Sequence, residues 1–243
     1  MKKKIKTWML FLAIASFFYA SPALAHAPRL LTNDGSVIEI SQPDVSQAFY
    51  GELKNGPAFF SLHLDTPQEL YVSILVPSSP GVKTDKSVQI KYDNGGKDEL
   101  FKELNGKIFS WTPFFEPFAG DNYLQGPEVK QMAAAGDYFI TVHSPDYTGK
   151  YVLVVGQKES FTVTEAVNTI FLLPSIKGFF GTSPWLAYFN YTGGFMFIGL
   201  LIIILIYFIL TSVLTRIFTP KHKDTVVETG KPHRPSDDLQ YRQ

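Results

Sequence analysis

Apolar and polar residues alternate through the middle of the chain, and this alternation predicts β-strands. In AFFSLHL (58–64), Phe60, Leu62 and Leu64 alternate with Phe59, Ser61 and His63, which is the period of a half-buried strand. The runs QELYVSILVP, Tyr138 to His143 and Lys150 to Val155 follow, with turn sequences such as SPDYTG between them. Short strands separated by turns predict an all-β ectodomain, an antiparallel β-sandwich or jelly roll.

The same alternation predicts which side chains form the core of this sandwich. The expected core residues lie on one face of their strands and are Phe60, Leu62, Leu64, Tyr138, Ile140, Val142, Tyr151 and Leu153. His63 and His143 fall on the opposite face. We therefore expect both histidines at the surface, and on a shared surface if their strands are neighbours.

The first 25 residues are typical of a secretory signal peptide. A basic start is followed by an apolar run, with Ala23 and Ala25 at the −3 and −1 positions of a cleavage site, which predicts His26 as the mature amino terminus. An uncleaved leader that serves as a membrane anchor is the alternative.

A second apolar run, Gly193 to Leu214, contains no charged residue and is long enough for one transmembrane helix. The basic residues Arg216, Lys221 and Lys223 follow it, and basic flanks favour the cytoplasmic side. The sequence thus predicts a single-pass protein of the cell membrane, with the N-terminal domain outside and the C-terminal tail in the cytoplasm.

Between the strands and this run lies an aromatic-rich segment in which a helix is expected to begin near Thr162 or Thr164. We interpret it as an interfacial segment on the outer leaflet. The expected organisation is a signal peptide at 1–25, an extracytoplasmic sandwich at 26–160, a juxtamembrane interfacial segment at 161–192, a transmembrane helix at 193–215 and a disordered cytoplasmic tail at 216–243.

Composition and motifs argue against several classes of function. The 22 basic and 22 acidic residues give a formal net charge of zero, so nothing suggests a nucleic-acid partner. No cysteine is present, which excludes disulfides, iron–sulfur ligation and thiol nucleophiles. The G-x-S-x-G and H-E-x-x-H motifs are absent as well, and we expect no enzymatic activity.

Two stretches, GELKNGPAFFSLHL and AAAGDYFITVHSPDYTGKYVLVVG, resemble the opening and closing strands of the bacterial pre-peptidase C-terminal domain. The positions that match its closing pattern are Gly136, Tyr138, Phe139, Val142, Gly149, Tyr151 and Leu153. The resemblance covers roughly residues 45–155, and the long aromatic insertion at 108–132 departs from it. It implies a β-sandwich that acts as a non-catalytic binding or solubilising module.

This insertion carries the candidate binding residues Trp111, Phe114, Phe115 and Phe118, placed around two prolines that disfavour regular structure. The rings either close one end of the core or form an exposed platform for a glycan or a partner protein. We therefore expect a membrane-anchored binding or accessory module that presents a loop surface to a cell-envelope polymer or to a membrane protein.

Copper handling is the alternative function. An amino-terminal histidine can chelate a metal through its α-amine and its imidazole, so His26 could bind copper together with His63 and His143. The principal expectation is that the protein holds no cofactor.

Calcium is a further possibility for the loops. Asp121, Asn122 and Asp146 offer oxygen ligands there, although such residues also hydrogen-bond the backbone of turns.

Overall fold

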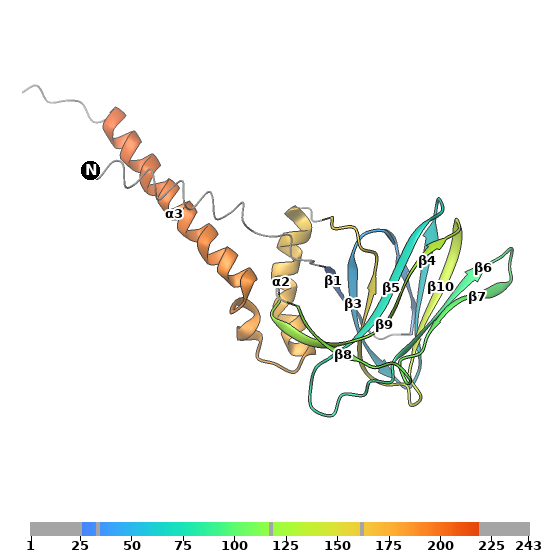
Figure 1. The fold of residues 1–243 in the computed structure, drawn as a ribbon. Coiled ribbons are helices and arrows are strands. Elements are labelled where there is room, and N and C mark those ends of the chain that lie inside the picture. Colours follow the sequence, from blue (N-terminus) through green and yellow to red (C-terminus); the bar gives the residue numbers. More distant parts are fainter. Residues whose placement is uncertain (1–25, 33–34, 117–118, 161–162, 219–243) are drawn as a thin grey trace, which may run out of the picture. The chain divides into compact units, whose positions relative to one another are not determined.

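The computed structural model describes residues 26–32, 35–116, 119–160 and 163–218, and within them the strands form two sheets (Figure 1). Sheet A has the order β1 (Ala27–Leu30), β3 (Gln47–Lys54), β11 (Thr148–Val155), β5 (Gln68–Pro77), β9 (Asp121–Ala133) and β8 (Thr112–Glu116). Sheet B has the order β2 (Val37–Ile40), β4 (Ala58–Leu64), β10 (Gly136–His143), β6 (Ser87–Asp93) and β7 (Asp98–Leu104). The helices are α2 (Val163–Phe179), the 3₁₀ helix η1 (Pro184–Tyr188) and α3 (Tyr191–Phe218).

The all-β sandwich expected from the sequence is confirmed, with one difference in strand direction. Most neighbours are antiparallel, but β1 runs parallel to β3 and β2 runs parallel to β4, so both sheets are mixed. These two short strands come from one stretch near the start of the described chain, and each lies at an edge of its sheet. Because the pairs lie at the edges, the strands that carry the core keep the antiparallel arrangement.

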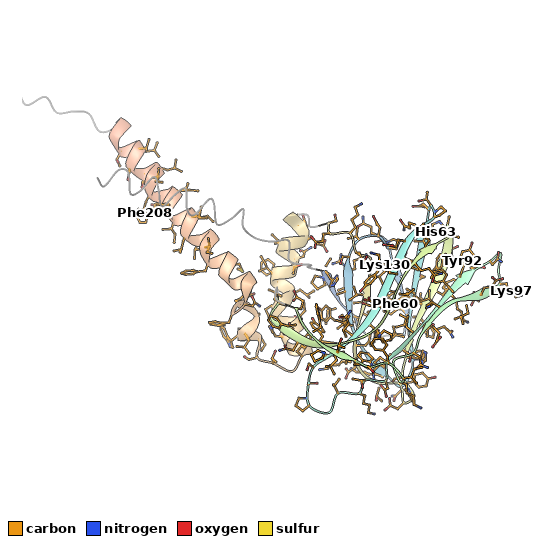
Figure 2. The ribbon with its side chains drawn as sticks, in the orientation of Figure 1. Phe60, His63, Tyr92, Lys97, Lys130 and Phe208 are labelled. Atoms are coloured by element: carbon orange, nitrogen blue, oxygen red, sulfur yellow. The ribbon has the colours of Figure 1, made fainter. Side chains whose placement is uncertain are left out.

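The core between the sheets contains all eight residues expected there, each at most 3% exposed. Phe49 of sheet A and Phe60 of sheet B meet edge to face across this core, with ring centroids 5.6 Å apart. His63, three positions after Phe60 on β4, lies at the surface, as Figure 2 shows. The strand faces predicted from the alternation are therefore correct.

Sheet A is covered on its other face too. Ala48, Val152 and Val154 point away from the core and pack with Ile176 of α2. This explains why β11 reads as a nearly continuous apolar run instead of an alternating one, because a strand covered on both faces has no water-facing side. α2, sheet A and sheet B thus form three layers.

α3, the C-terminal helix of the described chain, is apolar over most of its length. Its segment Met196–Thr215 is long and apolar enough to cross a membrane, and it is the one such helix in the part of the chain that the structure describes. The Thr211 and Ser212 hydroxyls donate back to carbonyls one turn earlier, so these polar groups are satisfied without water. The predicted signal peptide at 1–25 and residues 219–243 of the tail lie outside the described residues.

Candidate functional site

The outer face of sheet B carries a row of exposed apolar side chains that crosses the strands, here called the sheet B stripe. It consists of Val37 on β2, Phe59 on β4, Phe139 on β10 and Leu100 on β7. Val37 is the register partner of Phe59, and Lys91 of β6 lies between Phe139 and Leu100. No helix of the described chain covers this face, whereas α2 covers sheet A.

The two rings of the stripe are separated by hydroxyl groups. Phe59 lies opposite Thr141, and Phe139 lies opposite Ser61, so the rings occupy diagonal positions of one antiparallel pair. Side chains on such diagonals are within reach of each other when they are aromatic. Phe59 and Phe139 are 41% and 40% exposed, so both side chains are partly open to solvent.

His63 lies at one end of this face, beside two carboxylates. Its Nδ1 is 2.6 Å from Oδ1 of Asp137, the residue opposite it on β10, and its Nε2 is 3.7 Å from Asp65. The hydrogen bond to Asp137 raises the pKa of His63 above its ordinary value. The imidazole therefore carries positive charge over a wider pH range than a free histidine.

His143 lies on the same face as His63 but far along the sheet. It follows Asp137 by six positions on β10, which corresponds to about 20 Å at the usual rise of a strand. Its Nε2 contacts Glu103 on β7 at 3.6 Å, and Gln89 donates to the same carboxylate. The shared surface expected from the sequence exists, but the two imidazoles do not converge on it.

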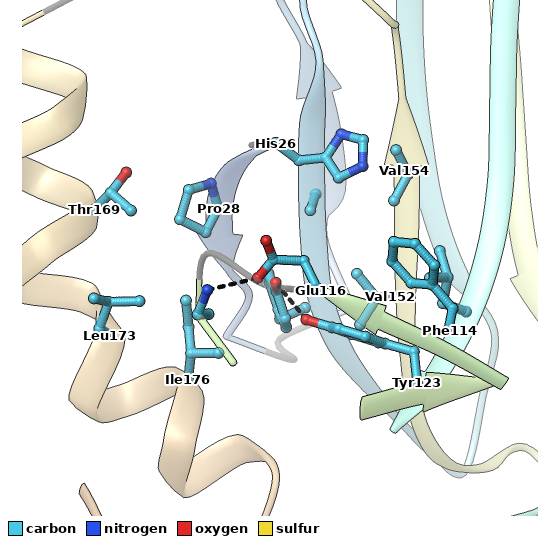
Figure 3. A pocket seen from close by; sticks show the side chains of 14 residues that line it. His26, Pro28, Phe114, Glu116, Tyr123, Val152, Val154, Thr169, Leu173 and Ile176 are labelled. Carbon is cyan, nitrogen blue, oxygen red and sulfur yellow. Dashed lines mark hydrogen bonds between the residues drawn. The ribbon is translucent and has the colours of Figure 1, made fainter. Parts of the chain in front are cut away.

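His26 lies on the other side of the sandwich, in a pocket between sheet A and α2. Figure 3 shows His26 and Glu116 on the sheet side, with Leu173 and Ile176 of α2 opposite. The His26 Nδ1 is hydrogen-bonded to the Ser46 hydroxyl, and burial lowers the pKa of the imidazole. The cavity has a volume of about 30 Å³, which is enough for one or two water molecules but for no larger ligand.

The three histidines of the copper hypothesis thus occupy three separate places, one on each end of sheet B and one behind sheet A. Among the described residues, no group of three or more histidine or acidic side chains is arranged to hold a metal ion.

Two of the three loop residues considered for calcium, Asp121 and Asp146, are engaged elsewhere. The Asp121 carboxylate faces an ammonium group, described below, and Asp146 accepts the Thr148 amide and pairs with Lys83. The Lys83 contact lowers the pKa of Asp146. Asp146 therefore stabilises the turn in which it lies, as aspartate residues in turns often do.

The aromatic insertion divides its rings between the core and the surface. Trp111 packs partly buried against the core and donates its indole N–H to the Gly106 carbonyl at 2.8 Å. Phe114 lines the His26 pocket, whereas Phe115, next along β8, is 54% exposed. Consecutive strand residues point to opposite faces, so these rings form no single platform. Phe118 lies outside the described residues.

A polar cluster that the sequence did not reveal joins α2 and η1 to the β8–β9 turn, and we call it the latch. Lys177 of α2 donates to the Ala119 carbonyl at 2.7 Å and to Oδ1 of Asp121 at 2.5 Å. Asn190, directly before α3, donates to the same Ala119 carbonyl at 2.7 Å. Lys177 and Asp121 are almost fully buried, and burial raises the pKa of Asp121 although the Lys177 ammonium opposes this.

The sheet B stripe and the latch were not predicted, but each has a trace in the sequence. Phe59 and Phe139 stand at the outward positions of alternating strands, where a polar residue is expected. Lys177 is the only charged residue between Glu165 and Arg216. Because a lysine is almost never fully buried unless it is paired, a lone lysine in an apolar segment that packs on a domain requires a partner there.

Comparisons with known proteins add a likeness of fold. No protein-family model and no curated protein matches the sequence. Among solved structures, the chain is similar to the pre-peptidase C-terminal domain of collagenase from Bacillus anthracis, with 12% identity over 51% of this chain and 98% of that one, at a TM-score of 0.33. This is the family that the sequence resembles.

A second similar structure is CorA, a surface-associated copper-binding protein of Methylomicrobium album BG8, with 9% identity over 51% of this chain and 98% of that one, at a TM-score of 0.29. A third is a β-glucosidase from Paenibacillus barengoltzii, with 10% identity over 53% of this chain and 13% of that one, at a TM-score of 0.23. At such low scores these likenesses say nothing about a ligand.

Proposed function

We propose that the protein is a membrane-anchored, non-catalytic module outside the cytoplasm that binds a cell-envelope polysaccharide through the sheet B stripe. The observation that carries this proposal is the pair of partly exposed rings, Phe59 and Phe139, on a sheet face that no other layer of the described chain covers. Single apolar residues at a surface are ordinary, but a row of them on one uncovered sheet face is typical of a site that binds a ligand or a partner.

The surroundings of the rings favour a sugar polymer over an apolar protein partner. Ser61 and Thr141 place hydroxyl groups beside the rings, and Gln89 and Lys91 add donors on the next strand. A sugar presents both C–H faces, which stack on aromatic rings, and hydroxyl groups, which need hydrogen-bond partners. The sheet B stripe crosses several strands, so an extended polysaccharide chain can contact it at several positions.

The test uses the full chain in lipid nanodiscs, incubated with purified cell-wall sacculi and sedimented. We expect the native protein to sediment with the sacculi and the variants Phe59→Ala and Phe139→Ala to lose most of this binding. Phe115→Ala is the matched control, because it removes an even more exposed ring from β8 and leaves the stripe intact. Loss of binding in Phe115→Ala alone would place the site on the insertion, and absence of binding by the native protein would overturn the polysaccharide proposal.

The proposed location has its own test, which does not depend on the ligand. Protease added to intact cells should remove the sandwich and leave an epitope attached to Gln243 protected. Degradation of that epitope in intact cells would reverse the proposed orientation. Sequencing the mature amino terminus checks cleavage before His26.

A further inference from the structure

The juxtamembrane segment has one buried face and one exposed face. One face of α2 is buried against sheet A and carries Leu173 and Ile176, both at most 2% exposed. The residues on the free face include Phe171, which is 76% exposed. In η1, Ala187 is fully buried while Trp185 is 82% exposed, as is Phe189 just after the helix. These outward rings therefore have no covering partner among the described residues.

This free face is uncharged as well as aromatic. Glu165, near the start of α2, forms an ion pair with Arg29 of β1 at 2.6 Å. The next charged residue is Lys177, which is buried in the latch. An exposed aromatic surface without free charges is unfavourable in water, but the headgroup region of a bilayer accommodates aromatic rings well.

The latch fixes this face to the sandwich. Lys177 and Asn190 both bind the Ala119 carbonyl, and the Tyr188 hydroxyl donates to the Ile170 carbonyl, so α2, η1 and the β8–β9 turn are joined by hydrogen bonds. Asn190 also accepts the Gly193 amide in the first turn of α3. The exposed rings therefore lie on a segment that hydrogen bonds fix to the sandwich, and not on a flexible linker.

The chain continues from this surface directly into the apolar helix. One residue, Asn190, separates Phe189 from the start of α3, and the apolar segment begins at Met196. If that segment crosses a bilayer, six residues of chain cannot carry Phe189 far from the membrane surface.

We infer that Phe171, Trp185 and Phe189 form a docking surface for the outer leaflet of the bilayer, so that the α2 side of the sandwich lies against the lipid and the sheet B stripe faces away from it. Among the described residues, the one cation near Phe171 is Arg29, whose charge is balanced by its ion pair with Glu165, so the surface selects lipid by the depth of its rings and not by headgroup charge. Docking should therefore be as strong on zwitterionic as on anionic bilayers and insensitive to salt. This inference concerns the α2 side alone and stands whatever the stripe binds.

Tryptophan fluorescence tests the docking in the full chain reconstituted into phosphatidylcholine vesicles. The chain has three tryptophans, so Trp8→Phe with Trp111→Phe leaves Trp185 as the reporter, and Trp8→Phe with Trp185→Phe leaves Trp111 as the matched control. We expect lipids brominated near the glycerol backbone to quench Trp185 strongly and Trp111 hardly at all. Equal quenching of both, or quenching of Trp185 by aqueous iodide instead of by lipid, would overturn the inference.

Protection of Trp185 from both quenchers would indicate that a second copy of the chain covers the surface, which also overturns lipid docking. The orientation is tested independently because the chain lacks cysteine. A lipid-sensitive fluorophore on Phe171→Cys should report the interface, and the same label on Phe139→Cys should report water. A label at Phe139 that senses lipid would refute the assignment of the two faces, whether or not sacculi bind.

Discussion

The ammonium group of Lys177 lies 2.5 Å from the carboxylate of Asp121 in the buried layer between α2 and β9, across 56 positions of sequence. Among the described residues, the second oxygen of this carboxylate, Oδ2, has no hydrogen-bond partner. The pair thus holds the helix to the sandwich through one short contact and two further hydrogen bonds from Lys177 to the backbone of the β8–β9 turn.

Lys177→Met should destabilise the protein strongly. The methionine fills similar volume, but it leaves Asp121 buried without its partner, which typically costs about 3–5 kcal/mol. Thermal unfolding of the full chain in detergent micelles, followed by near-ultraviolet circular dichroism, measures the loss. Lys158→Met is the control, since the exposed Lys158–Asp44 pair contributes less than about 1 kcal/mol. Equal effects of both changes would contradict the structural role of the latch.

The latch also shows what the sequence could not reveal. The alternation in 58–64 and 138–143 predicted the core correctly, because each strand has one buried face and the period of a strand is fixed. α2 gives no such signal, since apolar residues lie all around it. Which of its faces meets the sandwich depends on Ala119 and Asp121, and a contact so distant in sequence leaves no local pattern.

The candidate sites follow the same rule. The outward position of Phe59 and Phe139 is readable from the strand period, but the register that brings them to one diagonal is a property of the folded sheet. The copper hypothesis depended on the distance between histidines, which the sequence does not give. It correctly placed His63 and His143 on one face, yet the alternation fixes only the face and not the distance along it.

The strand faces can be checked by truncation. Leu62→Ala and Ile140→Ala each remove a buried aliphatic side chain from the core and should cost about 2–5 kcal/mol in the free energy of unfolding. His63→Ala, in the same strand as Leu62, should cost little because its side chain is largely solvated. Urea unfolding of the three variants in micelles provides the comparison, and a loss in His63→Ala as large as in Leu62→Ala would mean that the faces are inverted.

The pH dependence at His63 has a defined sign. Its pKa is raised above 6.5 by Asp137, so the folded state binds the proton more tightly than the unfolded state. The stabilisation is complete below the unfolded pKa and is lost as the pH rises through the higher folded value. Titration of the imidazole resonances by NMR should show the elevated pKa, and Asp137→Asn should move it back toward 6.5. An unchanged titration in Asp137→Asn would show that this carboxylate is not the cause.

Trp111 and Gly126 provide a test of how the aromatic insertion closes the core. A Cβ atom on Gly126 would lie 2.6 Å from the Trp111 ring and 2.8 Å from the Ile74 carbonyl oxygen, both far below contact distance. Because the backbone of β5 cannot withdraw, Gly126→Ala should displace the indole and cost about 1–3 kcal/mol. Gly56→Ala is the matched control, since its new Cβ would meet no atom within 4 Å. In a background without Trp8 and Trp185, the Trp111 emission should shift to longer wavelength in Gly126→Ala and stay unchanged in Gly56→Ala. A stable Gly126→Ala variant with unaltered emission would show that Trp111 does not pack over β9, and the insertion would then lie free of the core.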